Sequence, residues 1–191
     1  MKIEDHPLEP FLPKNAKVFM LGSFPPPRIR WKMNFYYPNL QNDMWRIFGI
    51  VFFQDPFYFL SEDRKSFKEM AIRTFLAEKG IAIFDVAQQV RRLQGNASDK
   101  FLEIVTVSDI KGLLNRLPFC QAVVTTGEKA TDALLSVFSE KVSKPTIGHP
   151  SRIYWQQREL AFYRLPSSSR AYPLPLVEKA KIYQSFFFDY F

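Results

Sequence analysis

The sequence predicts an α/β fold: a three-layer α/β/α sandwich around a central, mainly parallel four-stranded sheet. Short apolar runs that end in a turn alternate with segments whose apolar residues recur at helical spacing. Strands that alternate with helices in this way form parallel sheets with helices on both faces. The chain has 191 residues and no linker-like break, so we expect residues 1–191 to form a single domain.

Four apolar runs have the length of buried strands. They cover residues 17–22, 81–86, 122–127 and 159–165. The first and third runs close with glycine, which is typical of a strand that ends in a tight turn.

Five segments are expected to be helical. They cover residues 41–52 and 61–80, a short stretch from Ser108 to Leu114, a segment carrying Ala130 to Phe138, and residues 175–188. The second is predicted to start at Ser61-Glu62-Asp63, because acidic residues favour a first turn, and to stop at Gly80. Residues 91–100 are predicted to be a polar loop, and His149-Pro150-Ser151 a turn.

The composition predicts a folded cytoplasmic protein without a metal or another cofactor. Hydrophobic residues make up 47% of the chain, and no apolar run approaches the roughly 20 residues that span a bilayer. The first residues lack the apolar core of a signal peptide. The single Cys120 excludes an internal disulfide, and His6 and His149 are too few to favour a histidine metal site.

The net charge and the C-terminus bear on partners. The formal charge is +7, which is compatible with a polyanionic partner such as DNA but is not specific for one. The aromatic residues 186–191 either close the core or bury against a partner. We favour the core, and therefore a monomer, because terminal helices commonly dock in this way.

Polar side chains gather where the predicted strands end. They comprise Gly22-Ser23, Asp85, Thr125-Thr126-Gly127 and Ser167-Ser168-Ser169. The carboxyl ends of parallel strands share one edge of a sheet, where ligands bind in open α/β folds. We therefore expect the first and last of these segments to face one cleft, although they are far apart in the sequence.

The chemistry of this edge suits a nucleobase. Residues 35–42 are rich in aromatic rings, which stack on a base, and in amides, which recognise its edge. Such a site can cleave a glycosidic bond without a metal, because hydrogen-bond donors stabilise the departing base and an amide or carboxylate holds the water. There is no Gly-rich phosphate cradle and no nucleophile elbow.

Each residue also has a purely structural interpretation. Gly22 could only close a turn, Asn39 or Asn42 could cap the following helix, Asp85 could cap its own following segment, Tyr36 and Tyr37 could pack in the core, and residues 167–169 could form a plain turn. Residue types alone do not decide between these alternatives.

The motifs in their order resemble the uracil-DNA glycosylase superfamily, and within it most closely the hypoxanthine-DNA (deoxyinosine) glycosylase branch. The resemblance rests on Gly22-Ser23-Phe24-Pro25, on Tyr36-Tyr37-Pro38-Asn39-Leu40-Gln41-Asn42-Asp43-Met44-Trp45 and on Leu165-Pro166-Ser167-Ser168-Ser169. Residues 80–86 and 127–130 also resemble blocks of that branch, so the likeness runs over nearly the whole chain.

The resemblance implies a monofunctional DNA glycosylase of base-excision repair. Such an enzyme hydrolyses the N-glycosidic bond of a deaminated base, uracil or hypoxanthine, that is flipped out of DNA. Asn42 would position the water, with Ser23 and Asp85 as further catalytic residues. The implied base pocket consists of Gly22, Phe24, Pro25, Tyr36, Tyr37 and Ser168. The implied DNA contacts are Arg28, Arg30, Lys32, Ser167, Ser169 and Arg170.

Several positions depart from the family pattern. Asn39-Leu40 stands where relatives have His-Pro, Met44 where they have Phe, and Thr125-Thr126 where Asn often precedes the glycine. Arg170-Ala171-Tyr172 replaces Pro-Ala-Asn, and Phe24 occupies a slot that carries Asp or Asn in other superfamily members. Two alternatives therefore remain: a DNA-binding member of the fold that has lost catalysis, and a different α/β enzyme acting on a nucleoside or nucleotide.

Overall fold

The computed structural model describes residues 1–94, 98–138 and 141–191. The α-helices within these residues are α1 (Met44–Phe53), α2 (Glu69–Lys79), α3 (Ile110–Asn115), α4 (Glu128–Val137) and α5 (Leu176–Phe187). The strands are β1 (Ile3–Asp5), β2 (Val18–Gly22), β3 (Ile81–Asp85), β4 (Ala87–Arg92), β5 (Leu102–Val107), β6 (Ala122–Thr126), β7 (Ser151–Trp155) and β8 (Arg158–Leu165), with 3-10 turns η1 (Arg28–Arg30) and η2 (Asp99–Phe101). No helix in the described part of the chain is long and apolar enough to cross a membrane.

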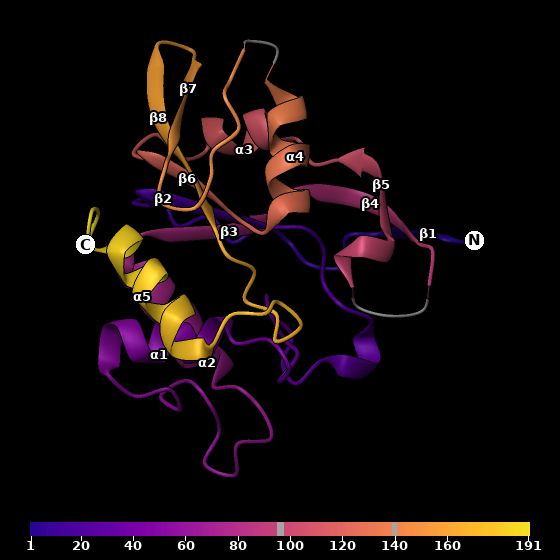
Figure 1. Cartoon of the computed structure of the whole chain (residues 1–191), viewed down its shortest axis with the longest axis vertical. Helices are drawn as coiled ribbons and strands as arrows, with labels where there is room; N and C mark the ends of the chain where they lie inside the picture. The colour runs from indigo at the N-terminus through magenta and orange to yellow at the C-terminus, as the bar shows by residue number, and fades with distance from the viewer. Residues whose placement is uncertain (95–97, 139–140) are drawn as a thin grey trace.

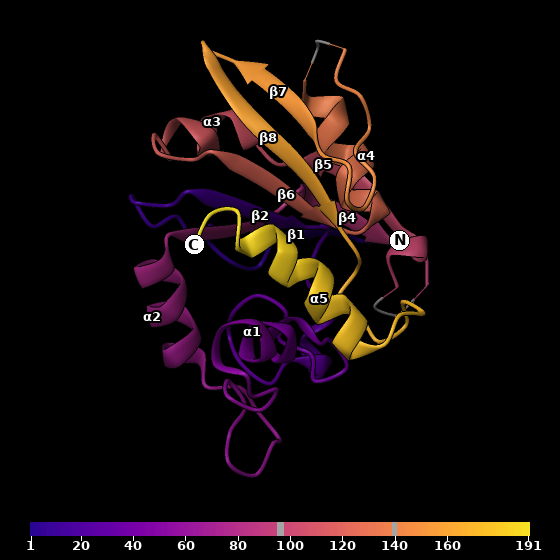
Figure 2. The same cartoon turned by 60° about the vertical axis from the view of Figure 1, so that its left-hand side comes forward.

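The main sheet has the strand order β3-β2-β6-β8-β7 and lies between two layers of helices. Helices α1, α2 and α5 cover one face, and α3 and α4 cover the other (Figures 1 and 2). Strands β3, β2, β6 and β8 are parallel, so their carboxyl ends meet at one edge. The α/β class and the parallel core of the sheet agree with the sequence prediction.

The prediction of four strands is wrong, because β7 adds an antiparallel edge strand to the described sheet. Strands β7 and β8 form a hairpin closed by Gln156 and Gln157, both with positive φ. The predicted turn at His149 is present as a bridge to Thr146, but Ser151 already belongs to β7. Strand β7 escaped prediction because alternate residues are exposed, which leaves no apolar run.

A second, small sheet has the order β1-β4-β5 and is antiparallel. The predicted polar loop over residues 91–100 is therefore wrong at both ends, since β4 continues through Arg92 and η2 starts at Asp99. Residues 95–97 of that loop lie outside the described residues. This sheet buries little apolar surface, essentially Ala87, Val90 and Leu102, which explains its weak sequence pattern.

The predicted start of the second helix is also wrong. The Ser61 hydroxyl donates to Asp63 Oδ1 at 2.7 Å in a separate turn, and α2 begins only at Glu69. The acidic residues after Ser61 thus stabilise a turn, because short polar side chains compete for local backbone and side-chain bonds. The predicted stop at Gly80 is confirmed, with φ of 78° in the left-handed region.

The core is continuous between the main sheet and the α1–α5 layer, where aromatic rings predominate. The ring centroids of Phe48 in α1 and Phe187 in α5 are 5.1 Å apart. Phe186 and Phe187 are 3% and 0% exposed and close the core as favoured from the sequence, whereas Phe188 of the same cluster is 61% exposed. Trp45, fully buried beside them, donates its indole N–H to the carbonyl of Tyr36 at 3.0 Å. The helix layer thus fixes the aromatic segment that precedes it.

Gly80 provides a test of the turn that leads into β3. A Cβ at Gly80 would lie 2.8 Å from the Asn15 carbonyl oxygen, and φ is 78°. We expect Gly80→Ala to lower the free energy of unfolding by about 2–4 kcal/mol, from left-handed strain plus a backbone clash. Urea denaturation measures this change.

The control is Gly148→Ala. Gly148 also has a positive φ, of 81°, but no atom lies within 4 Å of a Cβ placed there. Only the backbone strain, about 1 kcal/mol, is therefore expected to lower its free energy of unfolding. Equal losses in the two variants would contradict the clash.

Candidate functional site

A cleft of about 1400 Å³ opens at the carboxyl edge of the main sheet. It gathers nearly all the candidate residues of the sequence analysis. These are Gly22, Ser23, Phe24, Pro25, Arg30, Tyr36, Tyr37, Asn42, Asp85, Ser167, Ser168, Ser169 and Arg170. Arg28 and Lys32 are exposed residues beside Arg30 but do not line the cleft. The expected convergence of distant segments on one cleft is therefore observed.

Gly22 forms a narrow part of the cleft floor, and here the lack of a side chain is required. A Cβ would lie 2.5 Å from Asp85 Oδ1 and 3.0 Å from the Tyr37 hydroxyl oxygen. The Tyr37 hydroxyl in turn lies 2.9 Å from Thr126 Oγ1 at the end of β6. The ends of β3 and β6 and the loop that follows β2 thus bring a carboxylate, a hydroxyl and a phenol to one place beside Gly22.

The two neighbouring tyrosines occupy different environments. Tyr36 is 2% exposed and donates its hydroxyl to the Glu9 carbonyl at 2.7 Å. Its ring packs between His6, Phe35 and Phe84, so Tyr36 matches the core alternative. Tyr37 is half-buried and adopts φ of 52°, a strained conformation for this residue type. Burial raises the pKa of the Tyr37 phenol, and the nearby Asp85 carboxylate raises it further.

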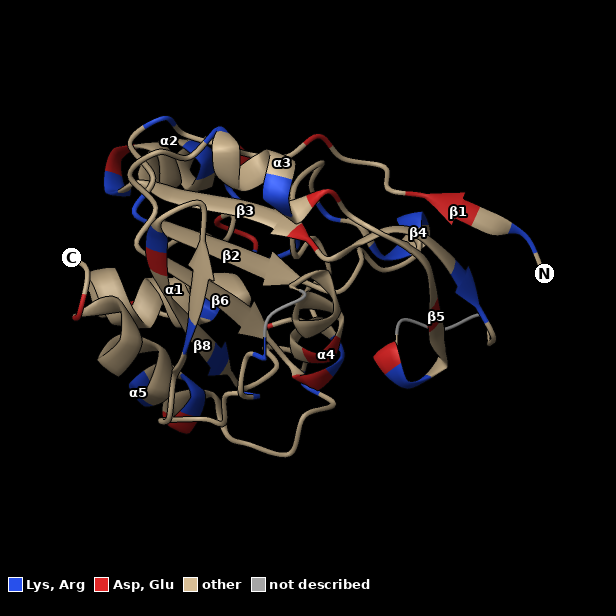
Figure 3. Ribbon diagram, turned by 90° about the horizontal axis from the view of Figure 1, so that it is seen from above, with Lys and Arg blue, Asp and Glu red and all other residues tan. Residues whose placement is uncertain are grey.

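Asp85 ends β3, where Figure 3 shows an acidic residue at the tip of the strand. Its Oδ2 atom lies 2.7 Å from His6 Nε2, and Asp85 is 5% exposed. The capping alternative for Asp85 is wrong, since its carboxylate pairs with His6 and the chain continues into β4. Sequence analysis missed His6 in the site because 79 residues separate it from Asp85.

Ser23 is paired with a second carboxylate. Its hydroxyl donates to Asp99 Oδ1 at 2.7 Å. Burial raises the pKa of the Asp99 carboxyl, while the Ser23 hydrogen bond and the Lys129 ammonium act against the rise. Because this bond uses the only hydroxyl hydrogen of Ser23, a ligand there meets Ser23 as an acceptor. Asp99 was missed because it lies in a segment predicted as a loop.

Asn42 has the capping role that the sequence left open. Its Oδ1 atom accepts the backbone N–H of Met44, the first residue of α1, at 3.0 Å. An amide oxygen has two acceptor positions, so one remains for a further donor. The bond to Met44 fixes the plane of the amide. Asn42 also forms an isolated β-bridge with Ser169, which joins the second motif directly to the last.

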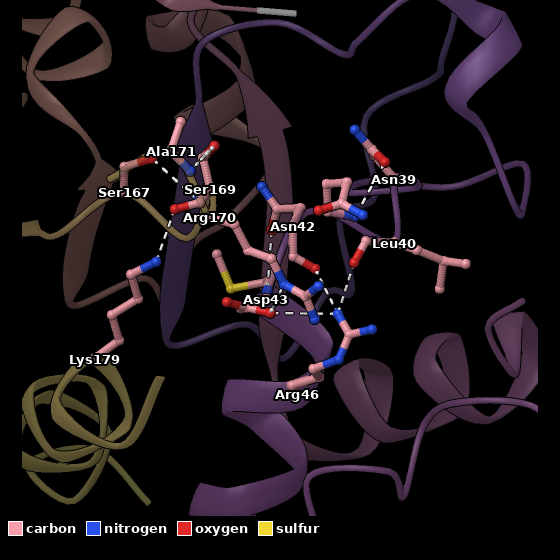
Figure 4. A network of polar contacts seen from close by, with 12 residues as sticks. Asn39, Leu40, Asn42, Asp43, Arg46, Ser167, Ser169, Arg170, Ala171 and Lys179 are labelled. Carbon is pink, nitrogen blue, oxygen red and sulfur yellow. Dashed lines mark hydrogen bonds and ion pairs between the residues drawn. The ribbon is translucent and has the colours of Figure 1, made fainter. Parts of the chain in front are cut away.

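Asp43 strengthens the same junction (Figure 4). The carboxylate, 5% exposed as a residue, lies 3.3 Å from Arg46 Nη1 and 3.1 Å from Arg170 Nε. Its backbone N–H donates to the Ser168 carbonyl at 2.8 Å. Burial lowers the pKa of the Arg46 guanidinium, Arg170 lowers it further, and Asp43 opposes both effects. One buried anion therefore holds two cations, one from α1 and one from the loop that precedes α5.

Helix α5 supports the serine loop from below. Lys179 is 1% exposed and donates from Nζ to the Ser169 carbonyl at 2.7 Å, as Figure 4 shows. Burial lowers the pKa of this ammonium group. The Tyr183 hydroxyl donates to the Pro166 carbonyl at 2.7 Å. These two bonds satisfy carbonyls of a loop that lies outside any helix or strand.

The three serines of this loop are not equivalent. Ser168 is 2% exposed and is largely a structural residue. Ser167 Oγ accepts the backbone N–H of Ser169, and Ser169 Oγ accepts that of Ala171, both at 3.2 Å. A hydroxyl that accepts a bond keeps its hydrogen, so Ser167 and Ser169 can each still donate to a ligand in the cleft.

Charges around the cleft are mixed. Its described lining contains the basic residues Arg30, Lys100, Lys129, Arg164 and Arg170 and the acidic residues Asp85, Asp99, Glu103, Glu128 and Asp132. The cleft residues Arg30 and Arg170 come from turn η1 and the connection before α5, segments that lie near α1 (Figures 1 and 2). Glu103, Glu128 and Asp132 come from β5 and α4, which lie away from α1. We call these the α1 side and the α4 side of the cleft. The α1 side carries Arg28, Arg30, Lys32 and Arg170, so one lip is basic. Arg28 is held over the Trp31 ring at 4.1 Å.

No group of three or more His, Cys, Asp or Glu side chains in the described ranges could hold a metal ion. The arrangement instead offers hydrogen bonds: acceptors on Asp85 and Asn42, and donors on Ser167 and Ser169. It is suited to bind and orient a flat polar ligand.

No protein-family model matches the sequence, and no curated protein matches it either. The fold resembles the solution NMR structure described as a "putative Uracil DNA glycosylase from Methanosarcina acetivorans". The superposition has a TM-score of 0.61 and covers 96% of this chain and 98% of that chain, at 21% sequence identity. The likeness establishes a common fold.

Asp43 provides a test of the junction between the two loops. Asp43→Ala leaves the buried Arg46 guanidinium without its carboxylate, so we expect the free energy of unfolding to fall by about 3–5 kcal/mol. Urea denaturation followed by circular dichroism measures the loss. Glu78→Ala, at an exposed position of α2, is the control and should leave stability nearly unchanged. A loss no larger for Asp43→Ala than for Glu78→Ala would show that the ion pairs contribute little.

Proposed function

We propose that this protein is a monofunctional DNA glycosylase that hydrolyses the N-glycosidic bond of a deaminated base, uracil or hypoxanthine, in base-excision repair. One observation carries the proposal: three separate motifs that resemble this superfamily line one cleft. The lining includes residues 22–25 of the first motif, residues 36–39, 41 and 42 of the second, and residues 165–169 of the third. The fold shared with a protein described as a putative uracil DNA glycosylase supports it.

The cleft would receive the base after it leaves the double helix. A base inside the stack is out of reach, so the nucleotide must be flipped into a pocket. Tyr37, half-buried against Gly22, offers a ring on which the base stacks, with Phe24 and Pro25 as further walls. Asp85 Oδ1 lies at the floor beside Tyr37 and can accept an N–H from the base edge.

Asn42 would hold the attacking water through the acceptor position of Oδ1 that Met44 leaves open. In the reaction the C1′–N bond breaks and its electron pair leaves with the base. The water oxygen then bonds to C1′, and the proton that the water loses ends on the departed base anion, which leaves the site as the neutral base. The hydroxyls of Ser167 and Ser169 are donors that would stabilise the anionic base, as in other oxyanion sites.

The basic lip would bind the DNA backbone. Phosphate contacts from Lys and Arg supply most of the affinity of such complexes and position the duplex without reading its sequence. We assign these contacts to Arg28, Arg30, Lys32 and Arg170, with the hydroxyls of Ser167 and Ser169 nearby. The acidic residues on the α4 side would keep the backbone to the α1 side of the cleft.

One observation favours a second candidate, a DNA-binding protein of this fold without catalysis. Asn42 Oδ1 already accepts the Met44 N–H, so its structural role alone accounts for the residue. This candidate predicts salt-dependent binding of DNA and no abasic product from any base. The third candidate, an enzyme acting on free nucleosides, has no such observation in its favour.

Asn42 is the decisive residue for catalysis. We expect Asn42→Ala to lower the single-turnover rate of base release at least about 100-fold, because the water loses its acceptor. The assay uses labelled oligonucleotides with uracil, hypoxanthine or xanthine, single-stranded and paired, with alkali to reveal abasic sites. The lost cap costs about 1 kcal/mol of stability, so Asn42→Ser, whose hydroxyl can replace the cap, separates folding from catalysis.

Asn15→Ala is the matched control, since Asn15 is an exposed asparagine that bonds the Ala77 carbonyl far from the cleft. It should retain the full rate. Base release by Asn42→Ala at the wild-type rate would disprove the role of Asn42. No base release by the wild-type protein, with DNA binding intact, would favour the silent DNA-binding protein.

The basic lip predicts a change in the salt dependence of binding. If Arg30 neutralises one phosphate, Arg30→Ala should reduce the slope of log Kd against log salt concentration by about one. Fluorescence anisotropy with a labelled duplex measures this slope. Lys14→Ala removes the same charge just before β2, away from the cleft, and should leave the slope unchanged. Equal slopes in all three proteins would exclude the phosphate contact.

A further inference from the structure

We propose that His6 is a positioning residue of this site: its buried imidazole holds the Asp85 carboxylate so that one oxygen, Oδ1, faces the flipped nucleotide. The inference rests on the proposed function and extends it to the N-terminal segment, which none of the motifs includes. The partner of Asp85 Oδ1 would be an N–H donor of the base. Uracil and hypoxanthine both carry such a ring N–H.

The His6 and Asp85 side chains form a short and buried contact. His6 Nε2 lies 2.7 Å from Asp85 Oδ2, and the two side chains are 0% and 7% exposed. A carboxylate oxygen only accepts, so Nε2 must carry the hydrogen of this bond. A charged or polar group that is buried costs free energy unless it is paired. Oδ2 is therefore committed to His6, and Oδ1 is left for the cleft.

The other ring nitrogen has a partner in either protonation state. His6 Nδ1 lies 3.0 Å from the Leu8 carbonyl oxygen and 3.2 Å from the Leu8 backbone nitrogen. A protonated Nδ1 can donate to that carbonyl, and a neutral one can accept from that N–H. The imidazole thus keeps its bond to Asp85 whether it is charged or neutral.

Aromatic neighbours fix the plane of the imidazole. The ring centroid of His6 is 4.5 Å from that of Phe84 and 5.2 Å from that of Phe24, which lines the cleft. Tyr36 packs at 6.2 Å. A ring held from several sides cannot rotate away, so it defines the direction of the carboxylate that it binds.

The small sheet explains how an N-terminal residue reaches this place. Strand β1 pairs with β4, and the His6 N–H donates to the Gln88 carbonyl at 2.8 Å immediately after the strand. Strand β4 starts two residues after Asp85. Pairing with β4 therefore places His6 directly behind the end of β3.

On the cleft side, Asp85 Oδ1 is equally constrained. It occupies space that a Cβ on Gly22 would need, 2.5 Å away, beside the Tyr37 hydroxyl. Any rotation of the carboxylate would move Oδ1 away from the surface on which we expect the base to stack. His6 thus acts on the nucleotide only through Asp85.

The test is a double-mutant cycle with His6→Ala, Asp85→Asn and the double variant. The readouts are the single-turnover rate on uracil and hypoxanthine substrates and the Kd for duplexes carrying the uncleavable 2′-fluoro nucleotides. Orienting partners of a site typically account for 10–100-fold. We expect His6→Ala to lower the rate by about that factor, and the double variant to be no slower than Asp85→Asn.

Two further variants separate positioning from folding. His6→Gln carries an N–H donor of similar reach, so we expect it to restore most of the rate that His6→Ala loses. If the site instead needed the imidazole ring for its packing, His6→Gln would be as slow as His6→Ala. His149→Ala removes the exposed second histidine and should behave as wild type. Melting temperatures establish that each variant is folded under the assay conditions.

The outcomes are distinct. A wild-type rate in His6→Ala, multiplicative effects of the two substitutions or no rescue by His6→Gln would overturn the inference while the proposed function stands. No base release by the wild-type protein would overturn the proposed function. In that case the double-mutant cycle is measured in the Kd for the uncleavable duplex. Equal affinities in all variants would overturn the inference, whereas a loss of affinity in His6→Ala that His6→Gln restores would support it.

Discussion

The buried Asp43 carboxylate is the interaction on which the arrangement of the cleft depends. It binds Arg46 on its own helix and Arg170 from the serine loop, 127 residues away. Without this anion the two cations would repel each other, because Arg170 already disfavours the charge on Arg46. Two backbone contacts join the same two loops: the Asp43 N–H donates to the Ser168 carbonyl, and Asn42 forms a β-bridge with Ser169. One aspartate thereby fixes the two motif loops against each other.

The parts that could be predicted from the sequence are those with a strong burial pattern. Strands β2, β3 and β6 are buried at every position, so they leave uninterrupted apolar runs, and parallel strands must end at one edge. The convergence of Gly22, Asp85 and Ser167 on one cleft follows from that geometry alone. Strand β7 and the small sheet are half-exposed, and the polar residues within them do not differ from those of loops.

The chemical partners within the site could not be predicted, because they depend on side-chain contacts between distant segments. Nothing local marks His6 as the partner of Asp85 or Asp99 as the partner of Ser23. The choice between Tyr36 and Tyr37 depends on a positive φ at the second residue, which turns the two rings to different sides. Asn42 illustrates a further limit: a capping bond and a water-binding acceptor use the same atom, and the sequence pattern is identical for both.

The strand order has a consequence for synthesis on the ribosome. Strand β2 lies between β3 and β6, and β6 pairs with β8, so every neighbour of the early strand in the main sheet is translated long after it. Long-range parallel pairing makes folding slow and leaves apolar edges exposed in the meantime. The cleft is complete only when the serine loop and the helix beneath it have emerged. Nascent chains that end before α5 would therefore lack the complete cleft and be prone to aggregate, a hazard expected for high contact order.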